Sequence, residues 1–191
     1  MTGAARPRVT LKLATSLDGR IALANGASQW ITGPESRAEV HRMRAAHEAI
    51  LTGIGTVLAD NPRLTARPEG GCDRQPDVVI MDSRDRTPSD AAVFAEAGRS
   101  VTLVPHRDLA RAVARYNTVM IEAGAQIAAA AIAADLVDRI EWFRAPVMLG
   151  GDGLPVVAAL GLETLEAAPI FKRTGIRERG ADLQESYERI R

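Results

Sequence analysis

The stretch SVTLVPHRDLARAVARYNTVMIEAGAQIAAAAIAA, residues 100–134, decides the fold class. The apolar runs at 100–104 and 118–121 are typical of buried strands, and the segments at 108–115 and 125–134 that follow them favour helices. This alternation of strands and helices predicts an α/β domain with a mostly parallel central sheet.

The chain on either side of this stretch adds further predicted elements. Turn residues at Asp18-Gly19 separate two extended runs, and Thr32-Gly33-Pro34-Glu35 has the spacing of a helix capping box with proline in the first turn. Asn61-Pro62 is expected to end a short helix that begins at the glycine turn 53–55. The predicted strands are 9–14, 20–24, 48–52, 78–81 and 139–144, and the first long helix is 36–46.

The end of the chain predicts an antiparallel hairpin. Gly180-Ala181-Asp182 is a turn signal between two extended segments. The final residues 187–191 are highly charged, which predicts that the last strand is an edge of the sheet. The loop at 67–76 is expected to be a surface excursion within one domain covering residues 1–191, with residues 1–8 as a linker or disordered start.

Composition excludes several classes of protein. The 191 residues include 24 basic and 24 acidic side chains, so no overall field favours nucleic acid or an anionic membrane. Cys72 is the only cysteine, which excludes an intrachain disulfide and favours a reducing, cytoplasmic location. The alanine-rich run at 125–134 is too short to cross a bilayer. The three histidines lack the spacing of a metal site, so we expect no metal.

Two strand-to-helix turns are candidates for phosphate binding, because a helix N-terminus presents free backbone N–H groups. One is Glu122-Ala123-Gly124, and the other is Gly53-Ile54-Gly55 with Thr56 as a hydroxyl donor. Both have an ordinary alternative. The first is also compatible with a simple turn and a solvated glutamate, and the second has only G-x-G of the dinucleotide fingerprint.

Other polar and aromatic side chains add to the candidates for ligand binding. Arg44, Arg63 and Arg67 are able to converge on a phosphorylated substrate, although solvation alone also explains surface arginines. Trp30 either stacks on a flat ring or fills the core, and its neighbour Ser28 is a hydroxyl donor.

Several motifs together resemble the reductase domain of the bifunctional riboflavin-biosynthesis deaminase/reductase. They are KLATSLDGR (12–20), SQWIT (28–32), AILTG (49–53), TVLADNPRLT (56–65), VIMDS (79–83), EAG (122–124) and APVMLGG (145–151). The resemblance implies a dihydrofolate-reductase-like, three-layer αβα fold with an antiparallel C-terminal edge. It also implies a homodimer that uses NADPH to reduce the ribosyl side chain of 5-amino-6-(5-phosphoribosylamino)uracil to a ribityl chain.

Residue roles follow from the resemblance, position by position. Lys12, Asp60 and Glu122 are implied near the reacting carbon. The implied cofactor-binding residues are Ala14, Trp30, Thr56, Asp60, Ser83, Gly124, Ala125, Gln126, Ile127, Ala128, Ala129 and Ala130. The implied substrate-binding residues are Ser28, Arg44, Leu64, Arg67 and Glu122.

The chain also differs from the bifunctional proteins. The deaminase half of that family carries a His-x-Glu and a Pro-Cys-x-x-Cys segment for zinc, and neither occurs here. We therefore expect no deaminase domain in this chain, and a deaminase that is separate or fused. After Gly124 the family more often has proline and a hydroxyl residue. Two alternatives stay open: a reductase of dihydrofolate or another pteridine, and a weakly active NADPH-binding module that dimerises and partners a separate deaminase.

Overall fold

The computed structural model describes residues 6–191. The strands are β1 (Arg8–Thr15), β2 (Arg20–Ala22), β3 (Ala49–Gly53), β4 (Asp77–Met81), β5 (Val101–Val104), β6 (Thr118–Ile121), β7 (Arg139–Arg144), β8 (Leu154–Pro155), β9 (Phe171–Arg179) and β10 (Asp182–Arg189). The helices are α1 (Pro34–Ala45), α2 (Ile54–Asp60), α3 (Leu109–Val113) and α4 (Ala125–Ala133), with a 3₁₀ turn η1 (Ala92–Ala95).

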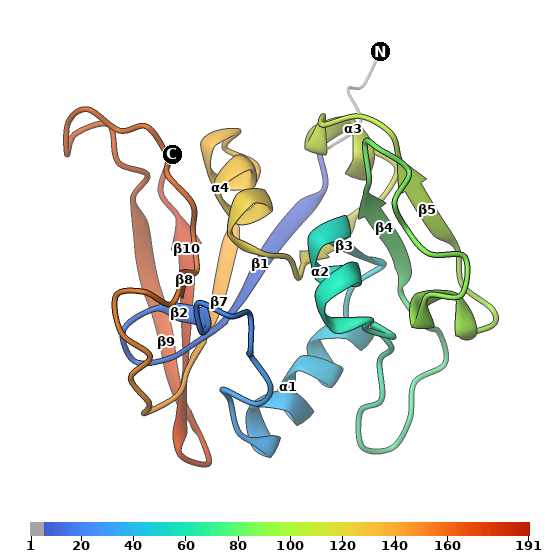
Figure 1. The fold of residues 1–191 in the computed structure, drawn as a ribbon, viewed down its shortest axis with the longest axis horizontal. Helices are drawn as coiled ribbons and strands as arrows, with labels where there is room; N and C mark the ends of the chain where they lie inside the picture. The colour runs from blue at the N-terminus through green and yellow to red at the C-terminus, as the bar shows by residue number, and fades with distance from the viewer. Residues whose placement is uncertain (1–5) are drawn as a thin grey trace.

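Eight strands form one sheet in the order β5-β4-β3-β6-β1-β7-β10-β9. The neighbours from β5 to β7 are parallel, whereas β10 pairs antiparallel with both β7 and β9. In Figure 1, β5 and the β9–β10 hairpin lie at opposite sides of the molecule. This arrangement confirms the predicted parallel sheet with an antiparallel C-terminal edge.

Apolar residues bury both faces of the parallel strands. In β3, Ile50 packs toward Met43 of α1, whereas its neighbour Leu51 belongs to the cluster that includes Ala128 of α4. Successive side chains of a strand point to opposite faces, so one strand contributes to two core layers. With α1 and α2 on one face and α3 and α4 on the other, the domain has the three layers that the resemblance implies.

The start of α1 differs from its predicted form. Gly33 is the N-cap, and no side chain of the cap accepts a hydrogen bond, so the expected capping box with Thr32 does not form. Instead Asp182 of β10 accepts from the Gly33 N–H at 2.7 Å and from the Ser36 hydroxyl at 2.6 Å. A carboxylate 149 residues away in the chain therefore satisfies the helix end.

The prediction that the last strand is an edge is wrong. The chain reverses at Gly180, where φ is +64°, and β10 then inserts between β7 and β9. The charges of β10 are paired across this position, for example Glu188 with Arg139. The edge strand on this side is β9, whose many charged and exposed side chains are typical of an exposed edge.

The beginning of the chain is only partly described. Arg8 is already in β1, and its N–H donates to Asn117 O at 2.8 Å, so any linker ends before this residue. Residues 1–5 of the predicted linker lie outside the described residues. Within residues 6–191, no helix has the length and apolar character needed to span a membrane.

Candidate functional site

A cleft of about 580 Å³ opens between α1, the start of α4 and the loop after α2. Its position follows from the topology, because β3 and β6 are parallel neighbours and the turns after them meet at one edge of the sheet. The residues of the predicted site that line the cleft are Lys12, Ala14, Ser28, Trp30, Arg44, Thr56, Asp60, Leu64, Arg67, Glu122 and Gly124.

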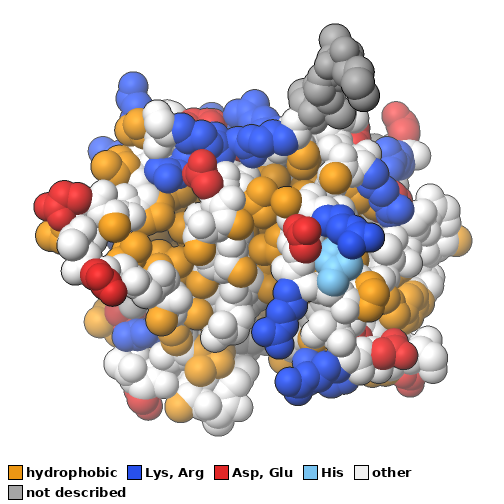
Figure 2. Space-filling view, turned by 90° about the horizontal axis from the view of Figure 1, so that it is seen from above, with side chains coloured by type: hydrophobic (Ala, Val, Ile, Leu, Met, Phe, Trp, Pro, Cys, Tyr) orange, Lys and Arg blue, Asp and Glu red, His pale blue; other side chains and the backbone are white. Residues whose placement is uncertain are grey.

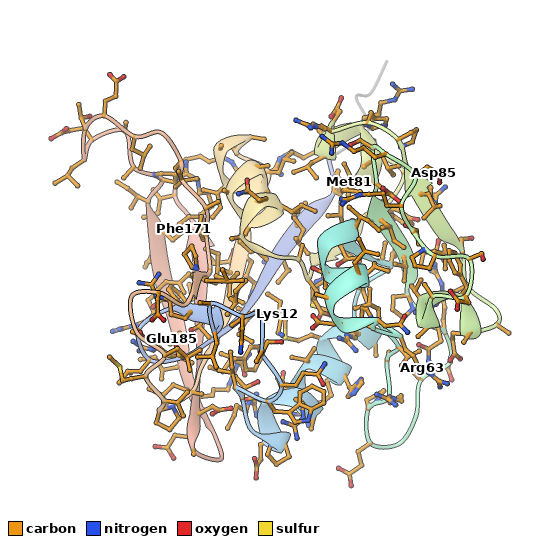
Figure 3. The ribbon with its side chains drawn as sticks, viewed as in Figure 1. Lys12, Arg63, Met81, Asp85, Phe171 and Glu185 are labelled. Carbon is orange, nitrogen blue, oxygen red and sulfur yellow. The ribbon has the colours of Figure 1, made fainter. Side chains whose placement is uncertain are left out.

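Glu122 and two cations form the centre of this cleft. Both carboxylate oxygens of Glu122 accept hydrogen bonds from Arg44, at 2.7 and 2.9 Å, in a bidentate pair. The Lys12 ammonium lies 4.0 Å from Glu122 Oε2, and Figure 3 shows Lys12 on β1 near the middle of the molecule. Three elements that are distant in sequence, β1, α1 and the end of β6, therefore meet at one carboxylate.

The surroundings shift the pKa values of Lys12 and Glu122. Burial lowers the pKa of Lys12, and Glu122 opposes this effect only in part. Burial works to raise the pKa of Glu122, but the charge and hydrogen bonds of Arg44 outweigh it, and the pKa is lowered. Glu122 is therefore held as a carboxylate, while Lys12 releases a proton more readily than an exposed lysine.

Asp60, at the end of α2, has the opposite shift. Desolvation in the cleft raises the pKa of Asp60, and a hydrogen bond with Ser28 opposes this only in part. Asp60 therefore keeps its proton to a higher pH than an exposed aspartate. Ser28, from the segment before α1, and Asp60, at the end of α2, both line the cleft.

The loop Arg63–Arg67 forms a cationic wall. Arg63 and Arg67 line the cleft, and Arg44 Nη1 donates to Thr65 O at 3.1 Å. Leu64 is 4% exposed and has a φ of +51°, a left-handed conformation that is rare for a branched residue. Arg63 and Arg67 are exposed on either side of the buried residues 64–66, an arrangement that suits the recognition of a phosphate group.

His41 and Arg37 line the same cleft, although neither is among the predicted site residues. His41 Nδ1 lies 3.0 Å from Thr65 O, and Nε2 lies 3.5 Å from Arg67 Nη2. Burial, together with the charge of Arg44, lowers the pKa of His41, which favours the neutral ring. The sequence does contain a signal for these residues, because positions 37, 41 and 44 share one face of a helix.

Trp30 is 71% exposed, so the alternative that it fills the core is wrong. The guanidinium of Arg37 lies 4.8 Å from the centre of its ring, in cation–π geometry. The exposed ring forms part of the cleft wall. A flat aromatic surface is thus available to a ligand.

Of the predicted cofactor-binding residues 124–130, only Gly124 lines the cleft. Gly124 is the N-cap of α4 and lines the cleft, and a side chain added there would meet no atom within 4 Å. Ala128 and Ala129 instead point into the core, at 0% and 6% exposure. The residues predicted for the cofactor that lie outside the cleft lining are Ser83, Ala125, Gln126, Ile127, Ala128, Ala129 and Ala130. Their role in cofactor binding stays a prediction.

Metal ligands are not clustered in the described part of the chain. Residues 6–191 contain no group of three or more His, Cys, Asp or Glu side chains arranged to hold a metal ion.

Comparisons with known proteins agree with this geometry. The family model of the RibD C-terminal domain matches residues 7–184. The riboflavin biosynthesis protein RibD of Mycobacterium tuberculosis is 39% identical over 183 residues, covering 93% of this chain and 53% of that protein. A diaminohydroxyphosphoribosylaminopyrimidine deaminase/5-amino-6-(5-phosphoribosylamino)uracil reductase from Thermotoga maritima is 29% identical with a TM-score of 0.83, covering 97% of this chain and 57% of that one.

A more distant likeness concerns the fold alone. Dihydrofolate reductase from Enterococcus faecalis is 14% identical with a TM-score of 0.60, and the match covers 96% of this chain and 97% of that one. The dihydrofolate-reductase-like fold is therefore confirmed. This chain spans about half the length of the RibD proteins that it matches. Its match to the family model across nearly all described residues shows that the chain belongs to the RibD C-terminal domain family.

Proposed function

We propose that this chain catalyses the NADPH-dependent reduction of the ribosyl side chain of 5-amino-6-(5-phosphoribosylamino)uracil to a ribityl chain. The observation that carries the proposal is the Lys12–Glu122–Arg44 cluster in a cationic cleft. Membership of the RibD C-terminal domain family supports it, as does the uracil reductase named for the T. maritima relative.

The residues at the carboxyl ends of the strands fit a nicotinamide cofactor. Gly124 leaves open space at the N-terminus of α4, where backbone N–H groups favour a phosphate. Thr56 is a hydroxyl donor at the start of α2, and Trp30 offers a ring surface. Ser83 follows β4, the neighbour of β3, and its proposed role is to bind the adenosine end of the cofactor. When bound, NADPH would supply the hydride.

The cationic wall of the cleft fits the phosphoribosyl part of the substrate. Arg63 and Arg67 would bind its phosphate, with Leu64 packed against the sugar chain and Ser28 donating to a hydroxyl. Among the described residues, the acidic side chains that line the cleft are Asp60 and Glu122, and the carboxylate of Glu122 is able to accept from ribose hydroxyls.

The proposed reaction divides into ring opening and reduction. As the C1′–O4′ bond of the ribose breaks, the amine nitrogen loses a proton, O4′ gains one, and an imine forms at C1′. The hydride then adds to C1′, and the nitrogen gains a proton. Lys12 and Asp60 are the candidate proton donors, since their shifted pKa values make proton exchange easier near neutral pH. Glu122, ionised and paired with Arg44, would orient the substrate and Lys12.

A homodimer is the proposed assembly. Figure 2 shows hydrophobic side chains gathered on the face that carries α4 and the segment before β9. Leu162, Leu165 and Ile170 of that segment are 47%, 89% and 60% exposed. Apolar side chains on a contiguous surface favour association. Sedimentation analysis should give twice the mass of the chain, and Leu165→Glu should shift the mass toward the monomer.

A deaminase, fused or separate, is the proposed supplier of the substrate. The RibD relatives are about twice as long as the matched region, which leaves room in them for a further domain. We also propose a cytoplasmic location, which the single cysteine supports.

Two substrates test the proposed reaction directly. Wild-type protein should oxidise NADPH with the deaminated phosphoribosylaminouracil and leave dihydrofolate unreacted. Turnover of dihydrofolate alone would favour a pteridine reductase. If neither substrate supports oxidation, while NADPH still binds, the chain is a binding module and the proposed activity is wrong.

A further inference from the structure

Arg99 holds the loop Arg63–Arg67 from outside the cleft. Its guanidinium donates from Nη1 to Leu64 O at 2.9 Å, and from Nη2 to Arg63 O at 2.5 Å and to Val93 O at 2.8 Å. Arg99 lies between η1 and β5 and is not among the residues that line the cleft. One side chain thus ties two consecutive carbonyls of the cationic wall to the segment behind it.

The guanidinium of Arg99 is held by backbone carbonyls and not by a carboxylate. Within residues 6–191, Arg99 has no carboxylate oxygen within 4.0 Å, so its charge is met by carbonyl dipoles and not by an ion pair. Partial burial lowers its pKa, with Glu96 opposing and Arg44 adding to the shift. A planar guanidinium with five donors is suited to bridge several carbonyls, whereas a lysine ammonium is not.

The carbonyls that Arg99 holds belong to the conformationally unusual part of the loop. Leu64 has a φ of +51° and is buried, and such a conformation persists only where the surroundings enforce it. Further along, Thr65 O accepts from Arg44, and Gln75 bonds both the N–H and the O of Ala66. Of the side chains that hold the loop backbone, Arg99 is therefore the one that bonds the left-handed residue, Leu64, directly.

We propose that Arg99 is a positioning residue, which fixes the Arg63–Leu64 backbone so that Arg63 and Arg67 present their guanidinium groups to the substrate phosphate. The proposal rests on the proposed function, because that function assigns the substrate phosphate to this wall. Arg99 itself touches neither substrate nor cofactor. Its removal should weaken substrate binding while leaving the cofactor turn at α4 unchanged.

Three variants separate a positioning role from general stability. Arg99→Met keeps the side-chain length and removes every donor, Arg99→Lys keeps the charge without the fork, and Arg107→Met removes an exposed arginine on a neighbouring loop as the charge control. We expect Arg99→Met to raise the KM for the phosphoribosylaminouracil about tenfold, with the KM for NADPH and kcat within about threefold of wild type. Arg99→Lys should lie between wild type and Arg99→Met, and Arg107→Met should match wild type.

Hydrogen exchange of the ligand-free protein gives a readout that does not depend on the substrate. The amides of residues 63–67 should exchange faster in Arg99→Met, while those of 124–130 should be unchanged. An unchanged KM for the uracil substrate together with unchanged exchange overturns the proposal. So does an equal rise in both KM values with faster exchange throughout the chain, which indicates a general loss of stability.

If the wild-type protein does not turn over the uracil substrate, the proposed function fails. In that case the exchange experiment still decides whether Arg99 fixes the loop.

Discussion

Glu122 is the residue on which the site depends, because it pairs with Arg44 through two hydrogen bonds and lies 4.0 Å from Lys12. Glu122→Gln should lower kcat about 100-fold or more by removing the charge that orients Lys12 and the substrate. It should also destabilise the protein by about 3 kcal/mol, since it leaves the partly buried Arg44 without its carboxylate. Steady-state kinetics and denaturant unfolding measure the two effects.

A matched surface change separates the local effect from a general loss of negative charge. Glu178 of β9 is exposed and is not among the residues that line the cleft, so Glu178→Gln should leave both kcat and stability unchanged. Turnover of Glu122→Gln within about threefold of wild type would show that this carboxylate is not needed for the reaction.

Individual residues differ in how well the sequence predicted them. Only the resemblance predicts that Lys12, Arg44 and Glu122 share one site, because their spacing across more than a hundred positions does not indicate proximity. His41 lacks the spacing of a metal site, but it shares a helical face with Arg44, and this periodicity is the local signal that it lines the cleft. Its contact with Thr65 O depends on where the loop folds back, which local patterns do not encode.

At the scale of elements, Gly53 lets α4 pack across the turn between β3 and α2. A Cβ at Gly53 would lie 2.5 Å from Ile127 Cδ1, although its φ of −112° suits any residue. Gly53→Ala should therefore destabilise the protein by about 1 kcal/mol, because the packed Ile127 side chain must leave its rotamer, and it should raise the KM for NADPH slightly, because Ile127 is in the first turn of α4. Denaturant unfolding and cofactor titration measure these effects.

Two further variants test this packing explanation. Ile127→Val removes the clashing Cδ1, so the double variant Gly53→Ala/Ile127→Val should recover most of the stability lost in Gly53→Ala. Gly55→Ala, where no atom lies within 4 Å of the added Cβ, should be neutral or slightly stabilising. Equal losses at Gly53 and Gly55 would contradict the packing account.

Asp18 ties the turn after β1 to the glycine-rich segment before β8. Hydrogen bonds from Ser16, Leu149 and Gly150 lower the pKa of Asp18 from 3.8 to about 2. The folded protein thus binds this proton less readily than the unfolded chain. The stabilisation is present above pH 3.8 and is lost as the pH falls toward 2.

Substitution of this carboxylate should change the acid limb of stability. Asp18→Asn should lower the free energy of unfolding at neutral pH and flatten its decline between pH 3.8 and about 2. Asp73→Asn, in the exposed 67–76 loop, serves as the charge control. If unfolding curves of Asp18→Asn and wild type decline in parallel over this range, Asp18 does not contribute as described.

The sequence predicted most elements to within two residues, because hydrophobic runs, glycine turns and the Asn61-Pro62 stop are local signals. It failed where a distant contact decides the outcome. Asp182 caps the N-terminus of α1. In the sheet, β10 lies between β7 and β9, so β9 takes the edge position. The pairing of β2 with the two-residue β8 likewise depends on tertiary contacts.

At the scale of the whole molecule, the fold brings the ends of parallel strands to one cleft and supplies different groups from each side. The turns after β3 and β6 offer glycine-rich helix starts, while α1 and the Arg63–Arg67 loop offer cations. In the proposed reaction, the dinucleotide and the phosphorylated substrate would meet at the Lys12–Glu122 centre. The family match indicated this architecture, and the side-chain network shows how the chain builds it.

The most direct test of the central claim follows the hydride. The protein is incubated with 5-amino-6-(5-phosphoribosylamino)uracil and NADPH deuterated at C4 of the nicotinamide, using each stereoisomer in turn, and the product is examined by NMR and mass spectrometry. We predict one deuterium at C1′ of a ribityl chain from one of the two stereoisomers, and loss of this product in Glu122→Gln. A product that carries no deuterium at C1′ from either isomer, or an unreduced ribosyl chain, would contradict the account.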